Sequence, residues 1–184
     1  MKRNIGNSLF ISVIVTMFGL SMGVLIGLTF DVPLPEQLII TNPPPQEWIF
    51  QNNSSVAIGL SLGGLLFGFI TIGILLFNSV FLGYWFQERI RSQGLMMVFI
   101  LVVPHGIFEI PALLLAGSVG IEITKWTFRL FFSSPSYDEE IKDQEGRSND
   151  GFIKWVMTRM IVVEVLLYIA SFIESYLTPL LVDM

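Results

Sequence analysis

The only histidine in the chain lies four residues before a glutamate, in the middle of an otherwise apolar stretch. His105 and Glu109 belong to the sequence PHGIFEIP at residues 104–111. In a helix this spacing places both side chains on one face, within hydrogen-bonding reach of each other. An ionisable side chain near the centre of a bilayer costs at least about 2.5–3.5 kcal/mol on insertion scales, so such residues usually have partners. The pair is therefore the first candidate for a polar site.

The last apolar stretch contributes two further polar residues, Glu174 and Thr178, which lie one helical turn apart on the same side. We predict that His105, Glu109, Glu174 and Thr178 form a buried polar cluster between two membrane segments. One histidine and two or three carboxylates can bind a metal ion. However, catalytic zinc normally takes three protein ligands in a defined set, and the sequence has neither an HExxH pattern nor a second histidine. We therefore assign no catalytic residue and expect no metal and no cofactor.

The composition is that of an integral membrane protein. Of the 184 residues, 53% are hydrophobic and 14% are charged, and the mean hydropathy is +0.70. We expect an all-α, polytopic helical membrane protein that forms a single membrane domain over residues 1–184. The net charge of -5 argues against nucleic-acid binding, which needs a clustered basic face. The absence of cysteine excludes disulfides and thiolate metal sites.

Four apolar stretches are the expected membrane segments, at 8–30, 55–77, 95–121 and 156–182. An outer loop at 31–54 and a cytoplasmic loop at 122–155 are the long connections between them. The outer loop is rich in proline and contains acidic residues but neither Lys nor Arg. The positive-inside rule therefore places this loop outside and the N-terminus in the cytoplasm, as expected for a multi-pass protein of the cell membrane.

The segment at 95–121 is expected to be hinged. Pro104 cannot donate a backbone hydrogen bond and favours a helix break just before His105. A broken or re-entrant pair of half-helices around Pro104-His105 would return the chain to its starting side and keep every basic cluster in the cytoplasm. The alternative is a single crossing, which would put Lys125 and Arg129 outside, against the charge rule. The expected hinge residues are Pro104, Gly106, Pro111 and Pro179, and the glycines expected to let another helix approach closely are Gly19, Gly23, Gly27, Gly59 and Gly63.

Two motifs in this order also point to a known family. The pattern Pro-His-Gly-x-x-Glu-x-Pro-Ala at 104–112, followed by Ala-Gly at 116–117, precedes Ile-Glu-x-x-x-Thr-Pro at 173–179. Together they resemble the stage II sporulation protein M family, and Asn78 with Leu82-Gly83 is similar to the polar break after that family's second span. The resemblance implies a polytopic membrane protein of bacteria and archaea. In spore formers the namesake acts as a membrane scaffold with a peptidoglycan-degrading partner pair, and many relatives in other organisms lie beside transporter-like genes.

Three functions remain open. The first is a non-catalytic subunit or scaffold of an envelope-remodelling or transport complex, assembled in the lipid bilayer with other membrane or envelope proteins or as a homodimer. The second is a permease-type transporter subunit, which would need a partner ATPase because the chain has no nucleotide-binding motif. The third is an intramembrane metal-dependent hydrolase built on the histidine and the glutamates. We expect the first, and hence a protein that is not an enzyme.

Overall fold

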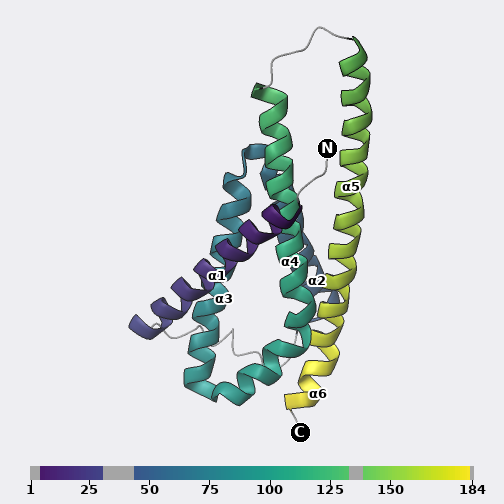
Figure 1. Cartoon of the computed structure of the whole chain (residues 1–184). Helices are drawn as coiled ribbons and strands as arrows, with labels where there is room; N and C mark the ends of the chain where they lie inside the picture. The colour runs from purple at the N-terminus through teal and green to yellow at the C-terminus, as the bar shows by residue number, and fades with distance from the viewer. Residues whose placement is uncertain (1–4, 31–43, 133–138, 183–184) are drawn as a thin grey trace.

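The computed structural model describes residues 5–30, 44–132 and 139–182, and these residues form helices and turns but no strand (Figure 1). The all-α prediction is confirmed. The helices are α1 (Ile5–Thr29), α2 (Gln46–Leu62), α3 (Phe69–Gln93), α4 (Leu95–Phe132), α5 (Glu139–Phe172) and α6 (Thr178–Val182), with a 3-10 turn at Gly63–Leu66 and a π-helical turn at Ile173–Leu177. Within the described residues, four stretches are long and apolar enough to cross a membrane: Gly6–Thr29, Phe69–Gln93, Leu95–Phe132 and Asn149–Leu181. The chain is therefore a multi-pass membrane protein.

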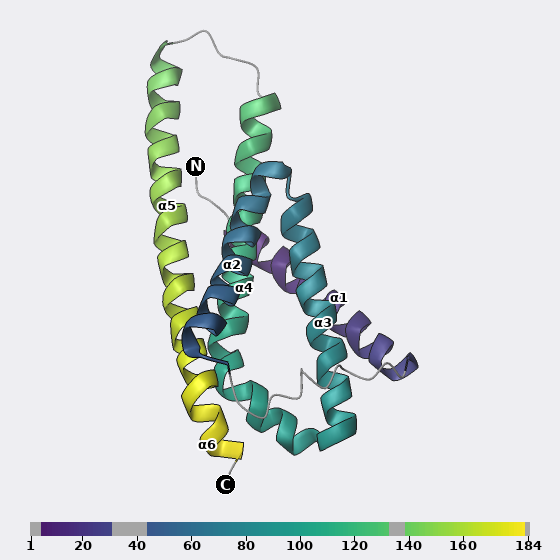
Figure 2. The ribbon, with the colours of Figure 1, turned by 180° about the vertical axis from the view of Figure 1, so that it is seen from behind.

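The central helix of the bundle is α4, which contacts α1, α2, α3 and α5. Both views show α4 beginning beside the end of α3, bending, and then running alongside α5 (Figure 1, Figure 2). The hairpin of α2 and α3 packs against α4, and α1 lies obliquely across α3. This arrangement places the bent half of α4 opposite α3, with the C-terminal turns beside it.

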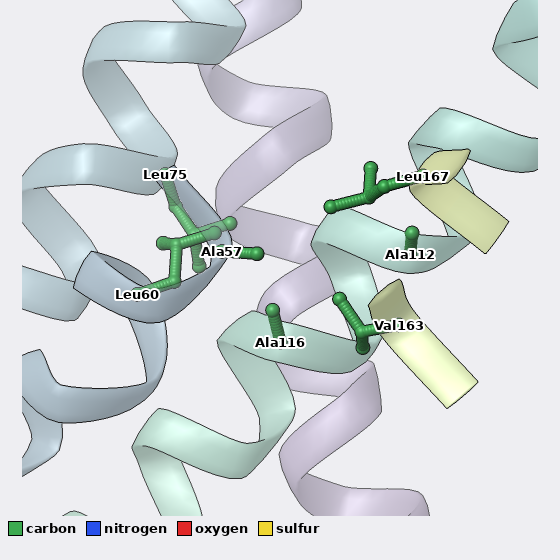
Figure 3. Close-up of a cluster of buried hydrophobic side chains, with 7 residues drawn as sticks. All are labelled: Ala57, Leu60, Leu75, Ala112, Ala116, Val163 and Leu167. Carbon is green, nitrogen blue, oxygen red and sulfur yellow. The ribbon is translucent and has the colours of Figure 1, made fainter. Parts of the chain in front are cut away.

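The apolar core lies where α2, α3 and α5 meet α4. Its buried residues are Ala57 and Leu60 of α2, Leu75 of α3, Ala112 and Ala116 of α4, and Val163 and Leu167 of α5. Figure 3 shows the small side chains Ala112 and Ala116 on α4, with Leu60 and Leu75 on one side and Val163 and Leu167 on the other. Small residues at these positions let the neighbouring helices approach α4 closely, which is how helices pack in a membrane.

The membrane segment predicted at 55–77 is divided between two helices, which is a correction. The turn between α2 and α3 contains Phe67 and Gly68 in the left-handed conformation, with φ of 54° and 78°. The turn is built of Gly, Leu and Phe, so the apolar pattern continues through it and does not mark the break. In addition, α2 begins at Gln46, so the end of the predicted outer loop at 31–54 is helical; residues 31–43 lie outside the described residues.

The predicted break at Pro104 is a bend, because α4 is one continuous helix that includes both Pro104 and Pro111. A proline inside a helix removes one backbone hydrogen bond and kinks the helix without ending it. The predicted return to the starting side does not occur. Arg91 donates a hydrogen bond of 2.6 Å to the carbonyl oxygen of Gly27 near the end of α1, whereas Lys125 contacts Ser8 near its start.

It follows that α4 connects opposite ends of α1, and that basic residues lie at both ends of the bundle. The positive-inside rule predicted that all basic clusters lie at one end, and a local contact explains why they do not. Arg91 hydrogen-bonds a carbonyl in the last turn of α1, where the unpaired carbonyl groups of a helix carry partial negative charge. A basic residue that caps a helix end is held by that helix, whichever side of the membrane the end faces.

The polar part of the cytoplasmic loop predicted at 122–155 is helical from Glu139 onward, which is a further correction. α4 continues to Phe132 and α5 begins at Glu139, and residues 133–138 lie outside the described residues. The tract at 139–150 is polar but rich in Glu, Lys, Gln and Arg and contains no proline. These residues are good helix formers, so a polar composition does not by itself indicate a loop.

Candidate functional site in a polar cavity

A cavity of about 700 Å³ lies among the helices, bounded by α1, α2, α3, α4 and the C-terminal turns. The polar and ionisable residues on its wall include Asn52, Asn53, Asn78, Arg89, His105, Glu109, Glu174 and Thr178. Most of the remaining wall is aliphatic or aromatic, as in small-molecule sites. Ionisable groups inside a membrane bundle are costly unless they serve a site or have partners, so this cavity is the candidate functional site.

The bent helix α4 provides the first two residues of the site. His105 and Glu109 lie one turn apart, and the His105 Nε2 and Glu109 Oε2 atoms are 4.0 Å apart. This separation is longer than a hydrogen bond, so the predicted direct hydrogen bond is not formed. The two side chains retain only 15% and 23% of their surface exposed. The Nδ1 atom of His105 is buried and has no hydrogen-bond partner among the described residues.

A local irregularity in the last helix provides the third residue. Glu174 lies in the π-helical turn Ile173–Leu177, in which the backbone N–H of Thr178 bonds the carbonyl of Ile173, five residues earlier. The hydroxyl of Thr178 donates to the same carbonyl at 3.3 Å. A π-turn inserts an extra residue and so rotates the side chains that follow, and such turns are frequent at functional sites.

The structure brings three of the four predicted cluster residues to one point. One ligand atom each of His105, Glu109 and Glu174 can be chosen so that all three atoms lie within 4.8 Å of one another. Thr178 lines the same cavity, but its hydroxyl is bonded to the backbone. Two carboxylates this close repel each other when ionised, whereas a positive charge between them is attracted to both. The arrangement is therefore suited to binding a cation or a cationic group.

The other predicted residues are found at helix contacts. A Cβ atom on Gly19, Gly23 or Gly27 would collide with Ser79, Val80 or Gln87 of α3, so this face of α1 lies directly against α3. A Cβ on Gly63 would lie 2.7 Å from the backbone N of Thr71, and one on Gly59 would lie 3.2 Å from Ile74 Cδ1. Pro111 and the buried Gly106 lie within α4, and Pro179 lines the cavity.

Sequence reasoning missed a second polar contact, at the start of α1. The hydroxyl of Ser8 donates to the Glu122 carboxylate, and Lys125 Nζ lies 2.7 Å from both the Ser8 hydroxyl and the carboxylate. Ser8 and Glu122 are buried. The available signal was the 122/125 spacing of an acidic and a basic residue, but nothing in the sequence indicates that Ser8 lies beside them.

A third polar contact joins α2 to α5, since the Ser54 hydroxyl donates to Glu164 Oε2 at 2.7 Å. Glu164 is thus hydrogen-bonded, unlike Glu109 and Glu174, for which the described residues provide no hydrogen bond. The cavity residues Asn52, Asn53, Asn78 and Arg89 were also missed, because isolated amides and one arginine have no distinctive spacing. Asn78 donates to the Ile74 carbonyl, and the Arg89 guanidinium lies 5.3 Å from the ring centre of Trp85.

Fold and site together define a class, namely a polytopic helical membrane protein with a polar cavity between its spanning helices. The chain belongs to the Stage II sporulation protein M family, whose model matches residues 12–179, a range that includes the whole cluster. The resemblance noted from the two motifs is thereby confirmed. An uncharacterized protein of Methanocaldococcus jannaschii is 33% identical over 135 residues, which cover 71% of this chain and 69% of that protein. No solved structure matches the chain.

Proposed function

We propose that the chain is a non-catalytic membrane subunit that assembles with other envelope proteins, and that it binds them through the polar beginning of α5. The supporting observation is the composition of this helix: α5 begins at Glu139, and its first turns, at 139–150, are polar and precede the apolar stretch. Both views show this end of α5 extending past the α2–α3 turn (Figure 1, Figure 2). The family name associates such proteins with sporulation, a process in which an envelope subunit would serve.

An aromatic contact joins α4 and α5 just after the polar turns of α5. The rings of Trp126 and Phe152 are stacked with centres 5.5 Å apart, and Phe152 stacks in turn on Trp155 at 6.0 Å. Trp126 Nε1 also donates a hydrogen bond of 3.1 Å to Asn149 Oδ1. Because α4 is the central helix of the bundle, this contact holds α5 against the membrane core at 149–155, directly after the polar turns.

The chemistry of the extension indicates the chemistry of the partner. Acidic residues outnumber basic ones in the tract at 139–150. A partner surface rich in Lys and Arg would complement it, and such contacts weaken as salt shortens the range of charge interactions. We therefore propose a partner with a basic surface next to the membrane.

The test is site-specific photo-crosslinking in native membranes. A photoreactive amino acid replaces the exposed residue Asp150 in one variant, and the exposed, apolar Ile161 of the same helix in the matched control. The proposal requires a protein adduct of defined mass at position 150, reduced in high salt, and none at position 161. Adducts at both positions or at neither would contradict it.

The cavity favours a second candidate, a permease-type transporter subunit whose substrate enters this space. Broken or bent helices that meet near the midplane and present ionisable side chains form such sites in known transporters. This candidate requires the cavity to be reached by water. A small water-soluble thiol reagent should then modify Asn78→Cys on the cavity wall, whereas Phe18→Cys on the outer, apolar face of α1 should stay unmodified. If neither cysteine is modified in the membrane, the transport candidate is rejected.

A further inference from the structure

We infer that His105, Glu109 and Glu174 bind a divalent transition-metal ion such as Zn²⁺ or Mn²⁺ on the cavity wall. The two helices approach so that an imidazole nitrogen and two carboxylate oxygens lie within 4.8 Å of one another. Ligand atoms of one tetrahedral zinc ion, at about 2.0–2.2 Å from the metal, lie roughly 3.4 Å apart. Movements of about 1 Å at the two flexible glutamate side chains would therefore close the site. This inference revises the expectation of no metal.

The charge of the site favours the ion. Two ionised carboxylates and a neutral imidazole together have a charge of -2, which a divalent cation would offset completely. A neutral assembly costs far less among membrane helices than unpaired charges do. Imidazole and carboxylate are ligands that Zn²⁺ and Mn²⁺ both accept.

The three side chains also have ligand atoms that make no hydrogen bond to the described residues. The 4.0 Å between His105 Nε2 and Glu109 Oε2 is longer than a hydrogen bond, although both side chains are largely covered. His105 Nδ1 is buried with no partner among the described residues. Glu174 reaches this point through the π-turn at Ile173–Leu177, an irregularity that apolar packing alone does not require. An ion between the three side chains would account for all of these observations.

The bound ion would join the bent part of α4 to the last helix and so fix one wall of the cavity. This role does not depend on a partner protein, and the metal site can be present or absent whether or not the assembly proposal holds.

The matched control is Glu164 of α5, ten residues before Glu174. Its carboxylate accepts a hydrogen bond from Ser54, and it is not one of the three proposed ligands. The chain is purified in mild detergent through a tag without histidine, stripped with a chelator, incubated with Zn²⁺ or Co²⁺, and washed. We expect about one equivalent of metal in the wild type and in Glu164→Gln, and at least tenfold weaker binding in Glu109→Gln and Glu174→Gln. Tightly bound Co²⁺ should also give visible absorption bands.

A second measurement needs no variant and so does not depend on variant folding. His105 is the only histidine, so acylation of imidazole by diethyl pyrocarbonate is followed at this one residue by the mass of the peptide that contains it. Zn²⁺ should slow the acylation of the wild type at least tenfold, and chelator should restore the rate. Metal binding that is equal in all variants, or an acylation rate that Zn²⁺ leaves unchanged, would overturn the inference.

Discussion

At the scale of single residues, glycine sets the distance between α1 and α3. A Cβ atom on Gly23 would collide with the backbone of Val80 and would lie 2.7 Å from the backbone N of Tyr84. Backbone atoms cannot rotate away as a side-chain end can, so the two helices would have to move apart. Gly73 of α3 is exposed and a Cβ there meets nothing within 4 Å. The two glycines are thus a matched pair.

Replacing Gly23 by alanine should destabilise the protein, whereas Gly73→Ala should not. We expect Gly23→Ala to lower the free energy of unfolding by about 1–3 kcal/mol, the usual cost of overpacking a close contact. Gly73→Ala should leave it unchanged or slightly raised, since alanine is the better helix former. Denaturant titration of both variants in detergent measures the difference. Equal stabilities would show that α1 does not pack against α3 at Gly23.

The buried Glu122 carboxylate accepts hydrogen bonds from Ser8 and Lys125, and of these two donors Lys125 is the charged one. Lys125→Met should lower the free energy of unfolding by about 1–3 kcal/mol, because the buried Glu122 carboxylate would lose its charged hydrogen-bond partner. The exposed Lys154 is the control, and Lys154→Met should change stability by less than about 0.5 kcal/mol. Thermal unfolding of the two variants side by side measures this, and an unaffected Lys125→Met would argue against the contact.

At the scale of elements, the bent helix α4 decides the topology of the protein. It links the end of α1 that contacts Arg91 to the end that contacts Lys125. A re-entrant pair of half-helices would have left both basic residues at one end. If the N-terminus is in the cytoplasm, as the charge pattern predicts, the end of α3 would lie outside and the beginning of α5 inside.

Single cysteines can test this topology, because the natural chain has none. Ser92→Cys near the end of α3 and Asp150→Cys in α5 are both at exposed positions. In intact cells a membrane-impermeant maleimide should label Ser92→Cys and should label Asp150→Cys only after permeabilisation. Labelling of both from the same side would restore the re-entrant arrangement and contradict the fold described here.

The features of the fold and the site that could be predicted are those set by the local sequence and its hydropathy. Helical class, membrane insertion and the meeting of His105, Glu109 and Glu174 follow from hydropathy and from the cost of ionisable groups in a membrane. The division of 55–77 could not be predicted, since Phe67 and Gly68 turn the chain without any polar residue. The contact of Ser8 with Glu122, 114 residues apart, depends on how α1 crosses the bundle, and no local pattern encodes that.

At the scale of the whole molecule, the structure has three parts with separate roles. The close-packed contacts around Ala112 and Ala116 hold the helices together. The polar cavity between α3 and α4 contains the proposed ion site. The polar first turns of α5, which precede the contact of Trp126 with Phe152, are the part proposed to bind partners. On this account the membrane part is a rigid support for the extension.

The central claim is that the chain is a subunit that binds a partner through the start of α5. The direct measurement is native mass spectrometry of the tagged chain, extracted in mild detergent from the membranes of its own organism. The wild type is compared with a variant in which the acidic residues at 139–145 are replaced by Gln or Asn, with Lys154→Gln as the control. We predict a second protein in fixed ratio with the wild type and the control, and its loss from the neutralised variant. A chain that is always recovered alone or only with copies of itself, or a partner retained in full by the neutralised variant, would contradict the account.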